Sequence, residues 1–117
     1  MKEKEIIRRV LSDLVPLVTS HGKGEKRILI NNEECKSGVA QVAFGKLKPG
    51  EIVESHQHPD MEEFFFFLEG RGIYEIGGKE YEVSPETFIR IPIKTNHELS
   101  VKGDGNLRFI YWGVVLD

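Results

Sequence analysis

Three histidines and two glutamates have the chemical types and the spacing that metal coordination requires. His56 and His58 are two residues apart in a segment of strand character, so we expect both imidazoles on one face. A Pro-Asp turn follows, and Glu62 and Glu63 open the next segment, so a hairpin would bring a carboxylate beside the two imidazoles. His97 is distant in sequence but also opens a predicted strand. These side chains are the candidates for one metal site.

Neutral imidazole and carboxylate together form a ligand set for transition metals. They suit Fe(II), Mn, Co, Ni, Cu or Zn better than calcium, which prefers oxygen ligands. A His-x-His pair alone is often surface decoration, and a Glu-Glu pair is usually a solvated strand edge, so the hypothesis rests on their conjunction. Strand alternation does not decide between Glu62 and Glu63, because phenylalanines follow on both faces.

Short segments rich in Val, Ile, Phe and Tyr occupy the chain from about residue 26, and glycine and proline turns separate them. Many short strands with regular turn signals predict an antiparallel β-barrel or sandwich. We expect strands over residues 26–30, 38–47, 51–57, 62–69, 71–76, 79–83, 86–91, 96–102 and 106–116.

The first 25 residues have a different pattern of apolar residues. Apolar residues recur at helical spacing over 3–15, and Pro16 would end a helix there. This predicts a short amphipathic helix, with an extended arm as the alternative. We therefore expect an N-terminal helix or arm over 1–25 that packs on the barrel, and a single β domain over 26–117.

Four consecutive phenylalanines and a leucine, residues 64–68, depart from the alternation of a half-exposed strand. Both faces of this strand should therefore be buried. Only one face can look into a small barrel, so the other needs cover from the N-terminal segment or from a second subunit. A central strand of a two-layer sandwich explains the same pattern. We expect a homodimer.

Composition excludes several classes of function. A net charge of −3 gives no basic surface for nucleic acid. Cys35 is the single cysteine, so neither an internal disulfide nor a thiolate cage is available. No apolar stretch approaches the ~18 residues that a bilayer requires, and the N-terminal segment does not resemble a signal peptide. We expect a cytoplasmic protein without nucleic-acid or membrane partners, with His21 in a loop.

The spacing around the histidine pair resembles the first motif of the cupin superfamily. That motif reads glycine, five residues, His-x-His, three or four residues, glutamate, six residues, glycine. Gly50, His56, His58, Glu63 and Gly70 all fit it. The match has five defined positions, which makes it far more specific than the histidine pair alone.

The second cupin motif is matched in part. Pro92 and His97 stand five residues apart, as in the family. Lys94 replaces the glycine between them, Glu86 stands where an earlier glycine would be, and Val101 replaces an asparagine. These departures fall at loop and turn positions and leave the ligand position in place.

The resemblance implies an all-β double-stranded β-helix, which is a small conical jelly-roll barrel with a metal near its wider mouth. It implies one divalent transition metal ion (Fe, Mn, Ni, Co, Cu or Zn) with positions open for water or substrate. By position, the implied ligands are His56, His58, Glu63 and His97, and the spacing to Gly70 favours Glu63 over Glu62.

A substrate in such a barrel would meet aromatic side chains, which supply apolar walls with polar tips. Arg90 shares a face with Phe88 and could anchor a carboxylate or phosphate, unless that face is exposed. Glu62, beside the expected ligand, is a candidate general base. The other candidate pocket residues are Phe65, Phe67, Tyr74, Phe109 and Tyr111.

Cupins with this ligand set include dioxygenases, isomerases and decarboxylases. The resemblance therefore implies chemistry on a small organic molecule. A ligand-binding or sensor cupin without turnover, in which the metal is structural or absent, is the alternative, because fold does not determine function. The sequence does not identify the metal or the substrate, and it leaves open whether the protein is an enzyme.

Overall fold

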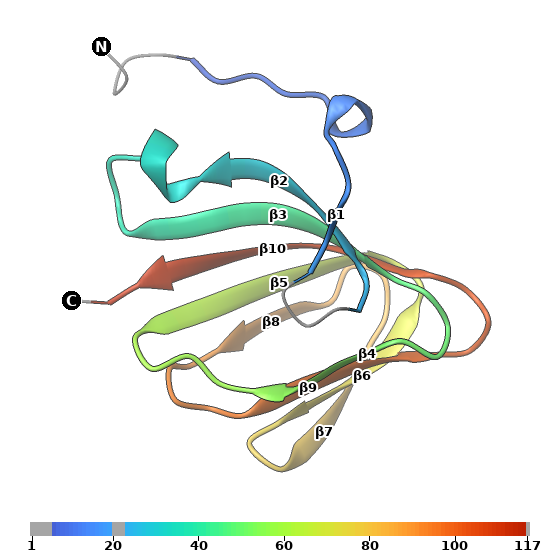
Figure 1. The fold of residues 1–117 in the computed structure, drawn as a ribbon. Coiled ribbons are helices and arrows are strands. Elements are labelled where there is room, and N and C mark those ends of the chain that lie inside the picture. The colour runs from blue at the N-terminus through green and yellow to red at the C-terminus, as the bar shows by residue number, and fades with distance from the viewer. Residues whose placement is uncertain (1–5, 20–22, 117) are drawn as a thin grey trace.

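Two antiparallel sheets make up most of the chain in the computed structural model, which describes residues 6–19 and 23–116 (Figure 1). β-Branched and aromatic residues dominate the segments between turns, and such side chains pack well on a pleated surface. The helical elements of the described residues are two 3-10 turns, η2 (Leu11–Asp13) and η3 (Asn32–Glu34). The strands are β1 (Leu17–Val18), β2 (Glu25–Asn31), β3 (Val39–Leu47), β4 (Ile52–His56), β5 (Met61–Glu69), β6 (Arg71–Ile76), β7 (Lys79–Val83), β8 (Phe88–Ile91), β9 (His97–Lys102) and β10 (Leu107–Val115).

The two sheets face each other and enclose the core, as in a jelly-roll barrel (Figure 1). One sheet has the order β1-β2-β3-β10-β5-β8 and the other the order β4-β9-β6-β7. The predicted all-β jelly-roll fold is confirmed. Each expected strand begins and ends within two residues of its predicted bounds. The pattern did not predict β1, a strand of two residues that pairs with β2.

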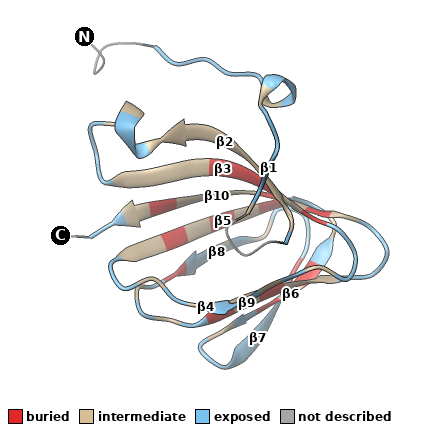
Figure 2. Ribbon diagram, in the orientation of Figure 1, coloured by how far each residue is buried: buried red, intermediate tan, exposed pale blue. Residues whose placement is uncertain are grey.

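Alternate residues of β5 explain how the barrel acquires its core. Glu63, Phe65 and Phe67 are buried, whereas Phe64 and Phe66 between them are only partly buried. Buried positions on the facing strands lie along the interior of both sheets (Figure 2). The buried hydrophobic cluster consists of Leu47, Phe65, Phe67, Tyr74, Val83, Ile91, Leu99, Leu107 and Phe109.

The outer face of β5 carries a second aromatic group. The Phe64 ring stacks against Trp112 on β10, with centroids 5.5 Å apart, and against Phe88 on β8 at 6.3 Å. Phe88 remains 55% exposed. We expected both faces of residues 64–68 to be buried. In the single chain the inner face is buried, but the outer face is only partly covered.

The N-terminal segment is an arm. Of the expected helix over 3–15, the described residues 6–15 contain only the turn η2, so the helix prediction is wrong for them. A short isolated helix is marginal without a packed apolar face, and here Ile6 is 89% and Val15 72% exposed. Arg9 ties the arm to the sheet by donating a hydrogen bond to the carbonyl oxygen of Leu29 at 2.6 Å. The boundary at residue 25 between the N-terminal segment and the β domain stays a prediction.

Parts of the expectations fall on residues that the structure does not describe. His21 and the start of the predicted helix, residues 3–5, lie outside the described ranges. Within those ranges, neither 3-10 turn has the length or apolar character to cross a bilayer.

Candidate metal centre

The four candidate ligands come from three strands and one loop. His56 ends β4 and pairs directly with His97, which opens β9, and their ring centroids lie 4.3 Å apart. His58 lies in the loop just beyond β4 rather than on that strand, which corrects the expected placement. Glu63 faces them from β5 in the opposite sheet. The structure thus brings together the residues that the motif spacing singled out.

Backbone carbonyls define the tautomers of two of these rings. Nδ1–H of His97 donates to the carbonyl oxygen of Thr95 at 2.8 Å, and Nδ1–H of His56 donates to that of Glu54 at 2.9 Å. In the neutral ring, Nε2 then carries a lone pair, which is the form that binds a metal. A backbone acceptor on the far nitrogen is also the arrangement that orients metal-binding histidines in proteins.

Two buried atoms at the centre of the cluster lack hydrogen-bond partners within the described chain, Nε2 of His97 and Oε1 of Glu63. They lie 3.2 Å apart, but the contact does not have hydrogen-bond geometry. A lone pair therefore faces a carboxylate oxygen in a buried site, where unpaired polar atoms are costly. A cation between them would satisfy both atoms.

The spacing of the ligand atoms also fits one ion. One nitrogen or oxygen from each of the four residues lies within 4.8 Å of all the others. Ligands about 2.0 to 2.2 Å from a common ion can be at most ~4.4 Å apart. The cluster is therefore only slightly wider than a closed coordination shell.

Two positions where the motif has glycine, one in the turn before β8 and one in the loop before His97, keep the backbone shape that glycine favours. Glu86 has φ 73° and Lys94 has φ 56°, both in the left-handed region that non-glycine residues seldom occupy. The Lys94 N–H donates to the carbonyl oxygen of His58 at 2.7 Å. This bond ties the loop before His97 to the loop that carries His58, so the departures from the motif leave the cluster assembled.

Two other predicted residues lie elsewhere. Glu62 and Arg90 form an ion pair at 2.8 Å on the outer face of β5 and β8, and the Arg90 side chain is 53% exposed. Glu62 therefore cannot serve as a base inside the barrel, and Arg90 cannot anchor a substrate there. The structure thus places Glu62 on the outer face and Arg90 at the exposed alternative, because adjacent residues of a strand point to opposite faces.

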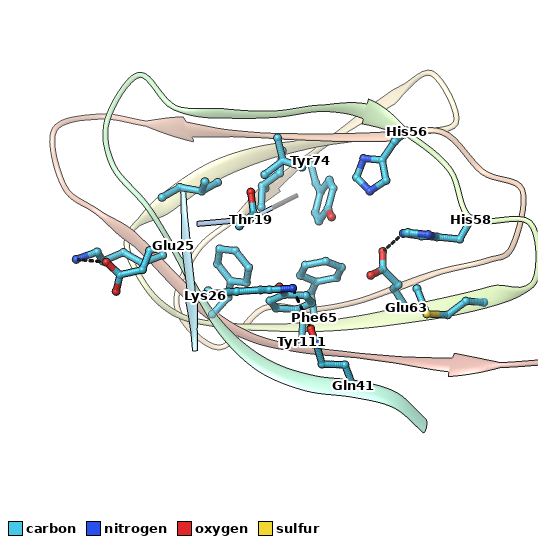
Figure 3. Close-up of a pocket in the computed structure, with 17 residues that line it drawn as sticks. Thr19, Glu25, Lys26, Gln41, His56, His58, Glu63, Phe65, Tyr74 and Tyr111 are labelled. Atoms are coloured by element: carbon cyan, nitrogen blue, oxygen red, sulfur yellow. Dashed lines mark hydrogen bonds and ion pairs between the residues drawn. The ribbon is translucent and has the colours of Figure 1, made fainter. Parts of the chain in front are cut away.

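A cavity of about 220 Å³ lies between the sheets, with His56, His58 and Glu63 on its wall (Figure 3). Phe65, Tyr74, Phe109 and Tyr111 line it as predicted, while Phe67 is packed behind them in the core. The sequence reasoning missed Lys26 and Gln41, which also border the cavity. Apolar and polar residues do not alternate regularly along β2 and β3. Only the pairing of these strands with each other and with β10 reveals which of their side chains face inward.

Both tyrosines of the cavity remain protonated at physiological pH. Burial raises the pKa of Tyr111 to about 12, and the negative charge of Glu63 adds to the effect. Burial also raises the pKa of Tyr74 well above its usual value, with smaller contributions from Glu63 and Tyr111. The two hydroxyls are therefore hydrogen-bond donors and poor bases.

Tyr111→Phe should make the metal-free protein less sensitive to alkali. The raised pKa of Tyr111 means that the folded state holds its proton more tightly than the unfolded state, so stability is lost as pH rises from 10 to about 12. A shift of this size corresponds to about 2 to 3 kcal/mol. Urea unfolding from pH 8 to 12 measures the difference, with Tyr81→Phe on the exposed strand β7 as the control. Identical alkaline losses in wild type and Tyr111→Phe would contradict the prediction.

A jelly-roll barrel with a cluster of three imidazoles and one carboxylate at its cavity wall, His97 lying just behind that wall, defines a class of small barrels suited to metal binding. Residues 43–113 match the family described as Cupin domain, which is more than half of the chain. The chain belongs to the cupin family.

Two relatives are similar in sequence. The polyketide synthase CurC of Streptomyces cyaneus is 31% identical over 88 residues, which is 75% of this chain and 57% of CurC. The chain therefore spans little more than half of that relative. An uncharacterized protein of Methanocaldococcus jannaschii is 29% identical over 107 residues, which is 91% of this chain and 84% of that protein.

Two solved structures share the fold. A predicted oxalate decarboxylase from Thermotoga maritima superposes with a TM-score of 0.86 at 23% identity, covering 96% of this chain and 100% of that one. The polyketide cyclase RemF of Streptomyces resistomycificus gives a TM-score of 0.82 at 19% identity, covering 97% and 81%. At these identities the likeness shows the fold alone.

Proposed function

We propose that the chain is a metal-dependent enzyme that acts on a small organic molecule, with one divalent transition metal (Fe, Mn, Ni, Co, Cu or Zn) held by His56, His58, Glu63 and His97. The observation that carries the proposal is a pair of buried atoms without hydrogen bonds, Oε1 of Glu63 and Nε2 of His97, with Glu63 on the wall of the cavity. A divalent metal there supplies a Lewis acid that polarises a carbonyl or enolate oxygen.

The chain's own residues would position the substrate and keep water out. The walls are mainly aromatic and apolar, so a bound organic molecule displaces water from the cavity. The protonated hydroxyls of Tyr74 and Tyr111 can each donate a hydrogen bond to a substrate oxygen. Glu63 and the imidazoles would be held by the metal and unavailable as bases.

The shortage of a base favours particular reaction types. Among described residues, the other carboxylate bordering the cavity is Glu25, which pairs with Arg27 at 3.5 Å and Lys46 at 3.9 Å. A reaction that abstracts a proton from carbon therefore has no evident carboxylate base. We propose a decarboxylase-like or dioxygenase-like reaction ahead of an isomerase-like one. The names of the oxalate decarboxylase and polyketide cyclase neighbours agree with an oxygen-bearing organic substrate.

His58→Ala tests the proposal, because this ring is far more exposed than that of His97 and its loss should spare the fold. Its side chain is 31% exposed, against 2% for His97. We expect stoichiometric metal in the wild type, much less in His58→Ala, and a melting temperature of the metal-free variant close to that of the metal-free wild type. Metal analysis and thermal melting measure both, and an oxygen-uptake and carbon-dioxide-release screen measures turnover.

The outcomes separate the candidate functions. Gln57→Ala, at the exposed neighbouring position, should keep the metal and serves as the control. A large drop in melting temperature for His58→Ala, without any turnover in the wild type, would support a structural metal. Ligand-dependent melting shifts without product would support a binding or sensor cupin. Absence of metal under every loading condition would refute the metal centre.

We also propose that two copies of the chain associate through the outer aromatic face of β5, β8 and β10. This face is defined by Phe64, Phe66, Phe88 and Trp112, and the described part of the N-terminal arm, from residue 6, does not cover it. The arm lies at the β2 edge of the six-stranded sheet, while β8 forms the opposite edge (Figure 1). A second copy would bury rings that the single chain leaves partly exposed.

Phe88→Glu should convert a dimer to a monomer, because a carboxylate at the most exposed ring of this face would have to lose its hydration on association. Sedimentation velocity measures the change. Tyr81→Glu, at a 42% exposed position on the other sheet, is the control and should remain dimeric. A monomeric wild type would refute the dimer and leave the metal proposal untouched.

The remaining parts of the proposal concern partners and location. The single cysteine, Cys35, is a free thiol, which agrees with a reducing compartment. We propose a cytoplasmic location and a small-molecule partner, with no role in binding nucleic acid because the net charge is −3.

A further inference from the structure

Lys26 borders the cavity from β2, and two strands, β3 and β10, separate it from β5, which carries Glu63. Lys26 pairs with Gly45 of β3, where a Cβ atom would lie 2.5 Å from the Phe109 ring, so the absence of a side chain at Gly45 leaves room for that ring. Nζ of Lys26 donates to Oε1 of Gln41 at 3.4 Å. Figure 3 shows the lysine side chain running along the cavity toward Gln41.

This lysine differs from its charged neighbours on the same sheet. Arg27 and Lys46, the adjacent cations on β2 and β3, both pair with Glu25, at 3.5 and 3.9 Å. No described carboxylate lies within 4 Å of the Lys26 ammonium, and its one hydrogen-bond acceptor is a neutral amide at long distance. A partly buried cation without a counter-charge is poorly compensated. Lys26 therefore has the capacity to bind an anion that enters the cavity.

The walls between Lys26 and the cluster suit a flat molecule. The rings of Phe65 and Tyr111 are nearly parallel, with an interplanar angle of 7° and centroids 5.2 Å apart. Tyr74 meets Phe65 edge-on at 81°, and Phe109 is tilted against it at 45°. Aromatic side chains pack favourably against planar rings in offset or edge-to-face geometry. This surface favours an aromatic or enolic ring over a flexible aliphatic chain.

We infer that the cavity binds a small flat organic anion, such as a single-ring aromatic carboxylate, with its charged group at Lys26 and its ring against Phe65 and Tyr111. The opposite end of such a molecule would point toward the histidine and glutamate cluster. The inference rests on the proposed function, because it takes this cavity as the substrate site. It names Lys26 as the residue that selects an acidic substrate.

The test compares benzoate with benzamide, its neutral counterpart of nearly the same shape. Binding to the full chain is followed by NMR titration, both with the metal present after purification and after chelator treatment. We expect wild type to bind benzoate more tightly than benzamide. Lys26→Met should weaken benzoate binding by roughly 10-fold or more, which is the usual scale for a hydrogen bond to a charged group. Benzamide binding should not change.

Two further variants make the result specific to the charge at this position. Lys26→Arg keeps the cation and should retain the preference for benzoate. Arg27→Met removes a cation from the adjacent residue, which lies on the opposite face of β2, and should bind benzoate as the wild type does. Circular dichroism and thermal melting establish that each variant is folded. If Lys26→Met unfolds, Lys26→Gln, which also removes the cation, takes its place in the comparison.

Each outcome either supports or overturns the inference. Equal binding of benzoate and benzamide to the wild type would overturn it, as would failure of both to bind, or a Lys26→Met variant that retains the preference. The proposed metal centre has its own readout, which is metal stoichiometry. A benzoate preference in a protein that never binds metal would refute the metal centre alone. Stoichiometric metal without a benzoate preference would refute the role of Lys26 alone.

Discussion

Glu63→Gln is expected to lower the affinity for a divalent metal roughly 100-fold or more. Replacing residues that merely orient metal ligands already costs about 10- to 100-fold, and Glu63 would itself contribute the only negative charge among the four ligands. The amide has nearly the same shape as the carboxylate, so the cluster should stay assembled while the charge that holds the ion disappears. Competition with a chromophoric chelator measures the affinity.

Glu62→Gln provides the matched control for this result. Glu62 precedes Glu63 on β5, undergoes the same chemical change, and lies on the outer face, where it pairs with Arg90 at 2.8 Å. Its replacement should leave metal affinity within about twofold of the wild type, since exposed ion pairs contribute little even to stability. If the two variants lost affinity equally, the carboxylate assignment would be incorrect. If neither lost affinity, the cluster would not be a metal site.

The contrast between these two glutamates shows what sequence reasoning could decide about the site. The motif spacing predicted the set His56, His58, Glu63 and His97, and the structure brings their ligand atoms within 4.8 Å. Alternation alone left Glu62 and Glu63 open, because phenylalanines occupy both faces of the strand. The pairing of β5 with β10 and β8 determines which face is inside, and that pairing joins segments far apart in the sequence.

Features that depend on neighbouring residues were predicted better than features that depend on contacts between distant segments. Strand bounds depend on nearby glycine and proline turns, and they were predicted closely. The N-terminal helix was wrong because helical spacing of apolar residues needs a surface to pack against, and in the described arm Val15 is 72% exposed. The direction of Arg90 was left open and Lys26 was missed, because the direction of each side chain depends on sheet register.

The backbone at two replaced glycine positions still has the conformation that glycine favours. Glu86 and Lys94 stand where the family motif has glycine, yet both adopt positive φ, at 73° and 56°. The backbone shape is therefore retained although the residue that favours it is not. The hydrogen bond from Lys94 N–H to the His58 carbonyl oxygen helps to impose that shape. A motif match can thus predict local geometry even at positions where the residue itself differs.

Gly70→Ala is expected to destabilise the protein by roughly 2 to 5 kcal/mol. Gly70 connects β5 to β6 with φ +85°, which costs a residue with a side chain roughly 1 to 2 kcal/mol. A Cβ atom there would also overlap the carbonyl oxygen of Asn106, and forcing extra atoms into a packed site costs roughly 1 to 3 kcal/mol. Urea unfolding of the metal-free protein measures the loss.

Gly50→Ala separates the two contributions, because the other glycine of the same motif has nearly the same backbone angle without the steric contact. Gly50 has φ +86°, and a Cβ atom there would meet nothing within 4 Å. It should lose only the conformational part, roughly 1 to 2 kcal/mol. Equal losses in the two variants would mean that the backbone angle is the whole cause and that the chain near Asn106 moves freely aside. A larger loss at Gly70 would show that this glycine is required by the close approach of the segment preceding β10, which carries Phe109 and Tyr111 into the cavity.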